Sequence, residues 1–94
     1  MYRYRITVES LTPGAAAQSM QFEAENHDDI FAIASRTAAS GRLGLDDDAT
    51  KAFVVGLKLF GETVLKNRTH PLFAPMKDAL GDFMRNLKAQ AAAK

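Results

Sequence analysis

The chain has 94 residues, of which 47% are hydrophobic and 24% charged, the usage of an ordinary globular domain rather than of a disordered, collagen-like or coiled-coil protein. It contains no cysteine, which excludes disulfides, thiolate metal sites and cysteine nucleophiles. The net charge of +1 argues against a dedicated polyanion binder, although residues 1–50 sum to −4 (four Arg, eight Asp and Glu) and residues 51–94 to +5 (eight Lys and Arg, three Asp and Glu).

Length and hydropathy predict one domain over residues 1–94, with a frayed C-terminal tail at about 89–94. Residues 1–10 alternate apolar side chains with arginines and so lack the apolar run of a secretory signal. No apolar stretch approaches the ~20 residues that cross a bilayer. We therefore expect a cytoplasmic protein without a membrane-spanning segment.

The first predicted elements are two strands, at about residues 2–11 and 18–25. Apolar and polar side chains alternate in both segments, which is the period of a half-buried strand. Pro13 and Gly14 between them favour a turn. We predict an antiparallel hairpin, with arginines of the first strand close to glutamates of the second on its outer face.

A first helix is predicted at about residues 27–40. Asn26 is a suitable N-cap, Asp28 and Asp29 fall in the first turn, where the helix dipole favours negative charge, and Gly41 suits the position after the helix.

The second predicted helix, at about residues 47–67, is apolar around most of its circumference. Such a helix is normally buried on most sides, so we place it at the centre of the fold. Gly56 and Gly61 are expected to let neighbouring elements approach it closely.

A third helix, at about residues 75–89, carries one compact apolar stripe and opens at Pro75. The sequence thus predicts an α+β domain of order β-β-α-α-α, an antiparallel hairpin packed on three helices. The predicted core comprises Tyr4, Ile6, Val8, Met20, Phe22, Ile30, Ile33, Phe53, Leu57, Phe60, Val64, Leu80, Phe83 and Leu87.

Four segments together resemble one known family: Tyr4-Arg5-Ile6-Thr7-Val8 and the residues at 22–31, 55–62 and 70–73. In this order and spacing they are similar to the domain of unknown function 3861 family, which consists of small uncharacterised bacterial proteins. The resemblance implies a compact α+β fold in a bacterial protein. It implies no activity, substrate or catalytic residue.

The residues of two segments are of the types found in metal sites and in nucleic-acid-binding sites. His27, Asp28 and Asp29 are metal-ligand types, but neighbours at a helix start point in different directions and capping explains them, so no metal or other cofactor is predicted. Arg3 and Arg5 beside tyrosines could hold nucleic acid. If the tyrosines pack inward they cannot stack on bases, and we do not expect nucleic-acid binding.

Acid–base chemistry by His70 with Glu62 is conceivable, because the two lie eight residues apart around the end of the second helix. A His-Pro pair after a helix is more often part of a turn, and neither a nucleophile nor a phosphate-binding glycine loop accompanies it. We predict no catalytic residue and do not expect an enzyme.

Two functional hypotheses remain. The first is a non-catalytic protein-interaction module that self-associates, as a homodimer through the hairpin edge or the second helix, because a lone hairpin has unpaired edges. The alternative is a small-ligand-binding or catalytic domain with its site near the C-terminal end of that helix, at Glu62, Arg68 and His70. The sequence identifies neither the ligand nor a protein partner.

Overall fold

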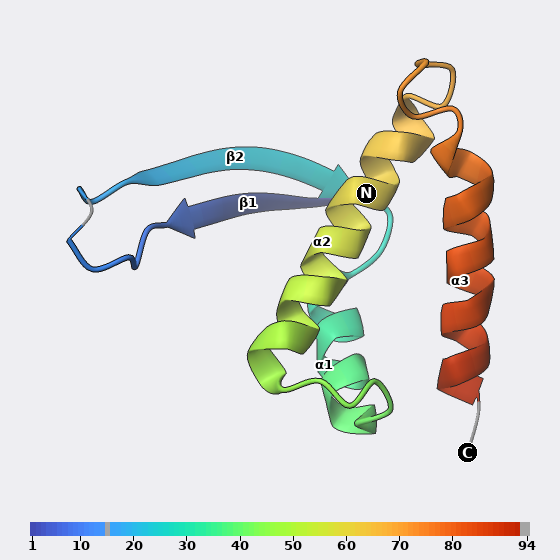
Figure 1. Cartoon of the computed structure of the whole chain (residues 1–94), viewed down its shortest axis with the longest axis horizontal. Coiled ribbons are helices and arrows are strands. Elements are labelled where there is room, and N and C mark those ends of the chain that lie inside the picture. Colours follow the sequence, from blue (N-terminus) through green and yellow to red (C-terminus); the bar gives the residue numbers. More distant parts are fainter. Residues whose placement is uncertain (15, 93–94) are drawn as a thin grey trace.

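The structure is a computed structural model that describes residues 1–14 and 16–92. Two strands are followed by three helices, which confirms the predicted α+β order (Figure 1). Each end of an element lies within three residues of its predicted position. The elements are β1 (Tyr2–Glu9), β2 (Ser19–Asn26), α1 (Ile30–Ser40), α2 (Asp47–Lys66) and α3 (Met76–Ala92).

The strands β1 and β2 pair antiparallel, in a register that runs from Tyr2 opposite Asn26 to Glu9 opposite Ser19. The predicted charge pairing is present, since Glu23 accepts from Arg3 at 3.0 Å and lies 3.6 Å from Arg5. All three side chains are exposed, so these pairs contribute little to stability. Within the described chain the sheet has only these two strands, and its outer edges lack a neighbouring strand.

Helix α1 begins three residues later than predicted, and its N-cap is Asp29 rather than Asn26. The Asp29 carboxylate accepts from the backbone N–H of Ala32 at 3.2 Å. Asn26 instead accepts from the N–H of Asp28 at 2.9 Å, which bends the chain between β2 and α1 before the helix can start. Gly41 ends the helix with φ of 64°, as predicted from its freedom to adopt positive φ.

Helix α2 lies between the other elements, with the base of the hairpin, α1 and α3 around it (Figure 1). Its start is capped by Asp46, which accepts from the N–H of Ala49 at 2.7 Å. Thr50 and Val54 are buried on α2. The prediction that neighbours approach both glycines was wrong for Gly56, since an added Cβ there would meet no atom within 4 Å.

The predicted core is only partly correct, because the single chain does not close around α2. Ile30 and Val64 are buried as expected, and the buried apolar set also contains Val54. Seven predicted core residues are half-buried: Tyr4, Ile6, Ile33, Phe53, Leu57, Leu80 and Leu87. Five others are exposed: Val8 (49%), Met20 (62%), Phe22 (43%), Phe60 (43%) and Phe83 (43%).

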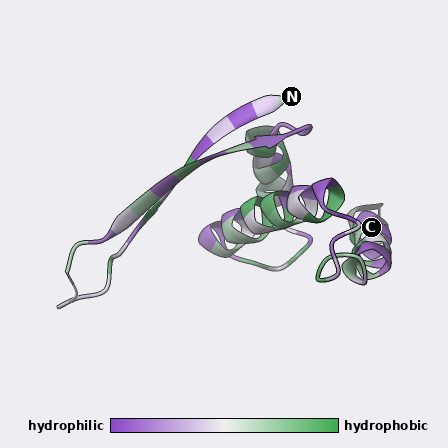
Figure 2. Ribbon diagram, turned by 90° about the horizontal axis from the view of Figure 1, so that it is seen from above, coloured by the Kyte–Doolittle hydropathy of each residue, from purple (hydrophilic) through white to green (hydrophobic). Residues whose placement is uncertain are grey.

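These predicted core residues are exposed because the molecule is extended. The hairpin extends away from the helices with its turn far from them (Figures 1 and 2). The radius of gyration is 15.3 Å, whereas a compact chain of this length has about 12 Å. The chain is therefore more extended than the compact fold that the family resemblance implies.

Candidate functional site

A cleft of about 560 Å³ lies between α2 and α3 and reaches the connection between β2 and α1. Its apolar lining includes Leu57 and Leu65 of α2 together with Leu80 and Met84 of α3. The Cδ2 atom of Leu80 would lie 3.9 Å from a Cβ built on Gly61, so the two helices meet closely at that point. The floor of the cleft between the two helices is therefore apolar, and the cleft is open to solvent.

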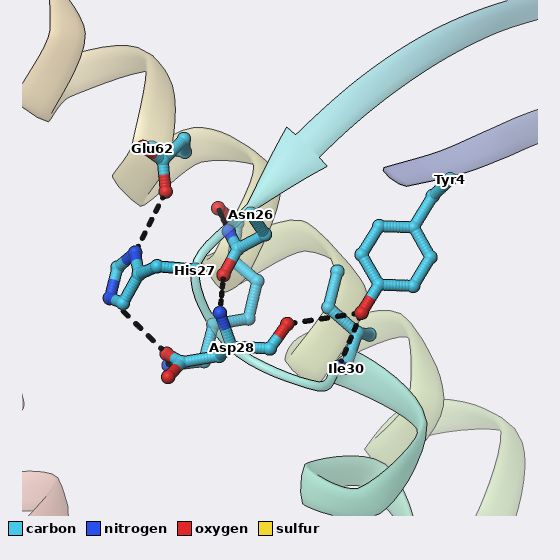
Figure 3. Close-up of polar contacts among 7 residues, drawn as sticks. Tyr4, Asn26, His27, Asp28, Ile30 and Glu62 are labelled. Carbon is cyan, nitrogen blue, oxygen red and sulfur yellow. Dashed lines mark hydrogen bonds and ion pairs between the residues drawn. The ribbon is translucent and has the colours of Figure 1, made fainter. Parts of the chain in front are cut away.

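Asn26 forms the buried end of the cleft, with 1% of its surface exposed. Its side-chain amide donates to the carbonyl of Lys58, in the middle of α2, at 3.0 Å. Its side-chain oxygen accepts from the N–H of Asp28, so both polar ends of the side chain have partners (Figure 3). Asn26 thus joins the end of β2 to α2.

His27 bridges two carboxylates at the mouth of the cleft (Figure 3). Its Nδ1 atom lies 3.0 Å from Glu62 Oε1, and its Nε2 atom lies 3.5 Å from Asp28 Oδ2. The Glu62 side chain is 13% exposed, whereas the His27 ring is 59% exposed. The imidazole is therefore open to solvent, while its carboxylate partner is held in the wall of the cleft.

Asp28 is also held by Lys58, whose ammonium group donates to Asp28 Oδ2 at 2.8 Å. This hydrogen bond is the main reason that the pKa of Asp28 is lowered from its ordinary value, and the positive charge of Lys58 acts in the same direction. The Lys58 side chain is only 17% exposed, so the pair is better shielded than the arginine pairs of the hairpin.

Tyr4 completes the joint between hairpin and helices (Figure 3). Its hydroxyl donates to the carbonyl of Asp28 and accepts from the N–H of Ile30, both at 3.0 Å. The Tyr4 ring lies 5.8 Å from the ring of Phe31. Because this face of β1 packs inward here, Tyr4 is not free to stack on a nucleic-acid base.

Two of the three residues predicted for a ligand site line the cleft, and one does not. Glu62 and Arg68 contribute to its wall, while His70 is absent from it. His70 Nδ1 accepts from the N–H of Leu72 at 3.1 Å, and its ring lies 5.2 Å from that of Phe73. His70 is thus a turn residue, and the histidine that contacts Glu62 is His27.

The residues that sequence reasoning missed are Asn26 and Lys58, and it considered His27 only as a metal ligand. Helical periodicity could not show that residues 58 and 62 of α2 meet residues 26–28. Asp29, the third member of the His27-Asp28-Asp29 group, faces α1 as its cap. Over residues 1–14 and 16–92, no three His, Cys, Asp or Glu side chains gather as a metal centre requires.

None of the helices within the described ranges combines the length and apolar character needed to span a bilayer. The chain presents a two-stranded arm and an open apolar cleft between α2 and α3.

Comparison with known proteins shows the family. Residues 2–89 match the model of DUF3861, a domain of unknown function with a solved structure, and the chain belongs to this family. A crystal structure of a protein of unknown function from Pectobacterium atrosepticum is similar, with a TM-score of 0.82 and 38% sequence identity. The match covers 94% of this chain and 97% of that one. Among curated proteins, none matches significantly.

Proposed function

We propose that the protein is a non-catalytic, cytoplasmic interaction module that self-associates, with a homodimer as its working form. The observation that carries this proposal is the surface area of one chain. The accessible surface is 7102 Å², whereas a compact monomer of 10.3 kDa exposes about 5,400 Å². The excess of about 1,700 Å² per chain lies within the ~1,000–2,500 Å² that each partner buries in an obligate dimer.

The exposed apolar residues support the same conclusion. Phe22, Phe60 and Phe83 each expose 43% of their surface, on β2, α2 and α3 respectively. Side chains of this type are normally buried, and large uncovered apolar patches usually mark protein contacts. We propose that a second copy of the same chain covers these side chains.

Sedimentation equilibrium and light scattering between about 1 and 100 μM test the proposal. We expect a mass of twice 10.3 kDa that falls towards 10.3 kDa only on dilution. A mass of 10.3 kDa across the whole range would refute it.

A second candidate function is supported by the cleft, because Glu62 and Arg68 both line it beside an apolar floor. An amphipathic small molecule with a carboxylate fits this combination, since Arg68 and Lys77 carry positive charge at the wall. Titration with decanoate should shift the NMR signals of Leu80 and Met84, and decylamine should shift them less. Equal shifts with both, or none with either, would exclude this function.

A further inference from the structure

The distal half of the hairpin carries an uncovered apolar surface. Ile6 pairs with Phe22 and Val8 with Met20, so these four side chains form two adjacent rows on one face of the sheet. We call them the arm patch. Nearer the helices, the same face is covered where Tyr4 meets Phe31. Phe22 still borders α2, since it lines a hollow with Leu59 and Thr63, and beyond it the hairpin leaves the helices (Figure 1). Val8, Met20 and Phe22 all stay exposed.

A second apolar surface, exposed at Phe60 and Phe83 and half-buried at Phe53, lies on α2 and α3. We call these three residues the aromatic strip. The rings of Phe53 and Phe83 pack edge to face, with centroids 6.1 Å apart. None of the three lines the cleft, whereas Leu57 and Val64 do. Since successive residues of a helix are turned by about 100°, Val64 and Leu57 project only about 40° and 60° from Phe60. The strip therefore adjoins the edge of the cleft without lining it.

Gly56 adjoins the strip on α2, one turn before Phe60. It is exposed, and a Cβ added to it would meet nothing within 4 Å. The glycine lowers the stability of the helix, yet no other part of its own chain packs against it. A neighbour from another chain can approach the backbone closely at this point.

One chain cannot bring the two surfaces together. Apart from Phe22, which borders α2, the arm patch is on the part of the hairpin that extends away from α2 and α3 (Figure 2). The base of the hairpin is held in this direction by Tyr4 and Asn26, which bond to the start of α1 and to α2. Both surfaces therefore keep exposed side chains in one copy, at Val8, Met20 and Phe22 and at Phe60 and Phe83.

We propose that the hairpin is an exchanged arm: in a two-fold dimer, the arm patch of each copy lies on the aromatic strip of the other. This inference rests on the proposed self-association and adds its mode. In a two-fold dimer a contact between two different patches occurs twice, so one arrangement covers all four surfaces.

Pairing of two hairpins edge to edge is the main competing arrangement. Edge pairing satisfies the free strand edges but adds its hydrogen bonds in the plane of the sheet. The arm patch projects from the face, and the opposite face carries the exposed Arg3, Arg5 and Glu23 group. Edge pairing alone therefore leaves both apolar surfaces exposed to water.

The absence of native cysteines allows a direct test by crosslinking between copies. One tagged copy carries Met20→Cys and a differently tagged copy carries Gly56→Cys. Met20 is 62% exposed, and the added side chain at Gly56 has free space, so both variants should fold. In a matched control, the second copy carries Ser35→Cys, at an exposed position of α1, instead of Gly56→Cys. Mixed copies are oxidised briefly and separated by non-reducing electrophoresis.

Arm exchange predicts a covalent heterodimer from Met20→Cys with Gly56→Cys, at least tenfold more abundant than the product with Ser35→Cys. A predominant Met20→Cys self-product would show arm-to-arm pairing and overturn the inference while leaving the dimer intact. A predominant Gly56→Cys self-product, or no product in a sample that light scattering shows to be dimeric, would also overturn it. A monomeric sample would remove the proposed function as well.

Discussion

Replacing Asn26 by alanine tests the most buried polar contact of the fold. The substitution deletes the donor to the Lys58 carbonyl and the acceptor of the Asp28 N–H, at a position that is 1% exposed. A buried group that loses its partner costs about 1–3 kcal/mol, and two groups lose a partner here, the Lys58 carbonyl and the Asp28 N–H. Because the Lys58 carbonyl lies in the middle of a helix and keeps its backbone partner, we expect a total loss of about 2–4 kcal/mol. This is a large share of the ~5–15 kcal/mol that stabilises such a domain.

The chain offers a matched control at Asn67, whose amide also donates to a helix carbonyl, that of Thr63, at 2.8 Å. Asn67 is exposed, and water replaces the lost bond, so Asn67→Ala should cost only about 0.5–1 kcal/mol. Urea unfolding of both variants at one protein concentration measures the difference, since association makes stability concentration-dependent. If Asn26→Ala cost no more than Asn67→Ala, the argument from burial would be refuted.

Three further predictions concern the apolar surfaces and the joint between hairpin and helices. Val64→Ala should lower the free energy of unfolding by about 2–3 kcal/mol at any protein concentration, because Val64 is 1% exposed. The loss caused by Phe60→Ala should instead grow with concentration, as association covers this side chain. Urea unfolding at 1 and 100 μM distinguishes the two behaviours. The lowered pKa of Asp28 contributes stability above its unfolded value of 3.8 that is lost as pH falls through the folded value. Below about pH 4, the free energy of unfolding should therefore fall less steeply with decreasing pH in Lys58→Met than in the native protein. The same slope in both proteins would contradict this prediction. Tyr4→Phe removes both hydrogen bonds of the hydroxyl and should lower the free energy of unfolding by about 1–2 kcal/mol. Thermal unfolding should then show a lower Tm, and an unchanged Tm would contradict this prediction.

The order and extent of the five elements could be predicted from the sequence because local chemistry sets them. Alternation over residues 2–8 and 20–24, Gly41 after α1 and the acidic start of α2 act within a few residues of chain. The same local signals predicted the cross-strand Arg–Glu pairing. They misplaced the start of α1, because Asn26 is drawn into contacts with α2 that are 32 residues away.

The candidate site was predicted only in outline. Glu62 lies near the end of α2, and Arg68 lies two residues after the helix ends, so their proximity follows from the chain itself. The partner of Glu62 depends instead on where another segment lies in space. His70 is nearer to Glu62 in sequence, yet the structure brings His27 to it, at a distance of 3.0 Å.

The sequence by itself determined which residues form strands and helices and that α2 is apolar on most sides, since these depend on periods of two and 3.6 residues. Only the tertiary structure decided what covers those sides. The hairpin leaves the helices beyond Tyr4, and Phe60 and Phe83 stay exposed in one copy. An apolar pattern records that a surface avoids water, but hydrophobic burial is non-directional, so the pattern cannot tell whether the cover comes from the same chain or from another.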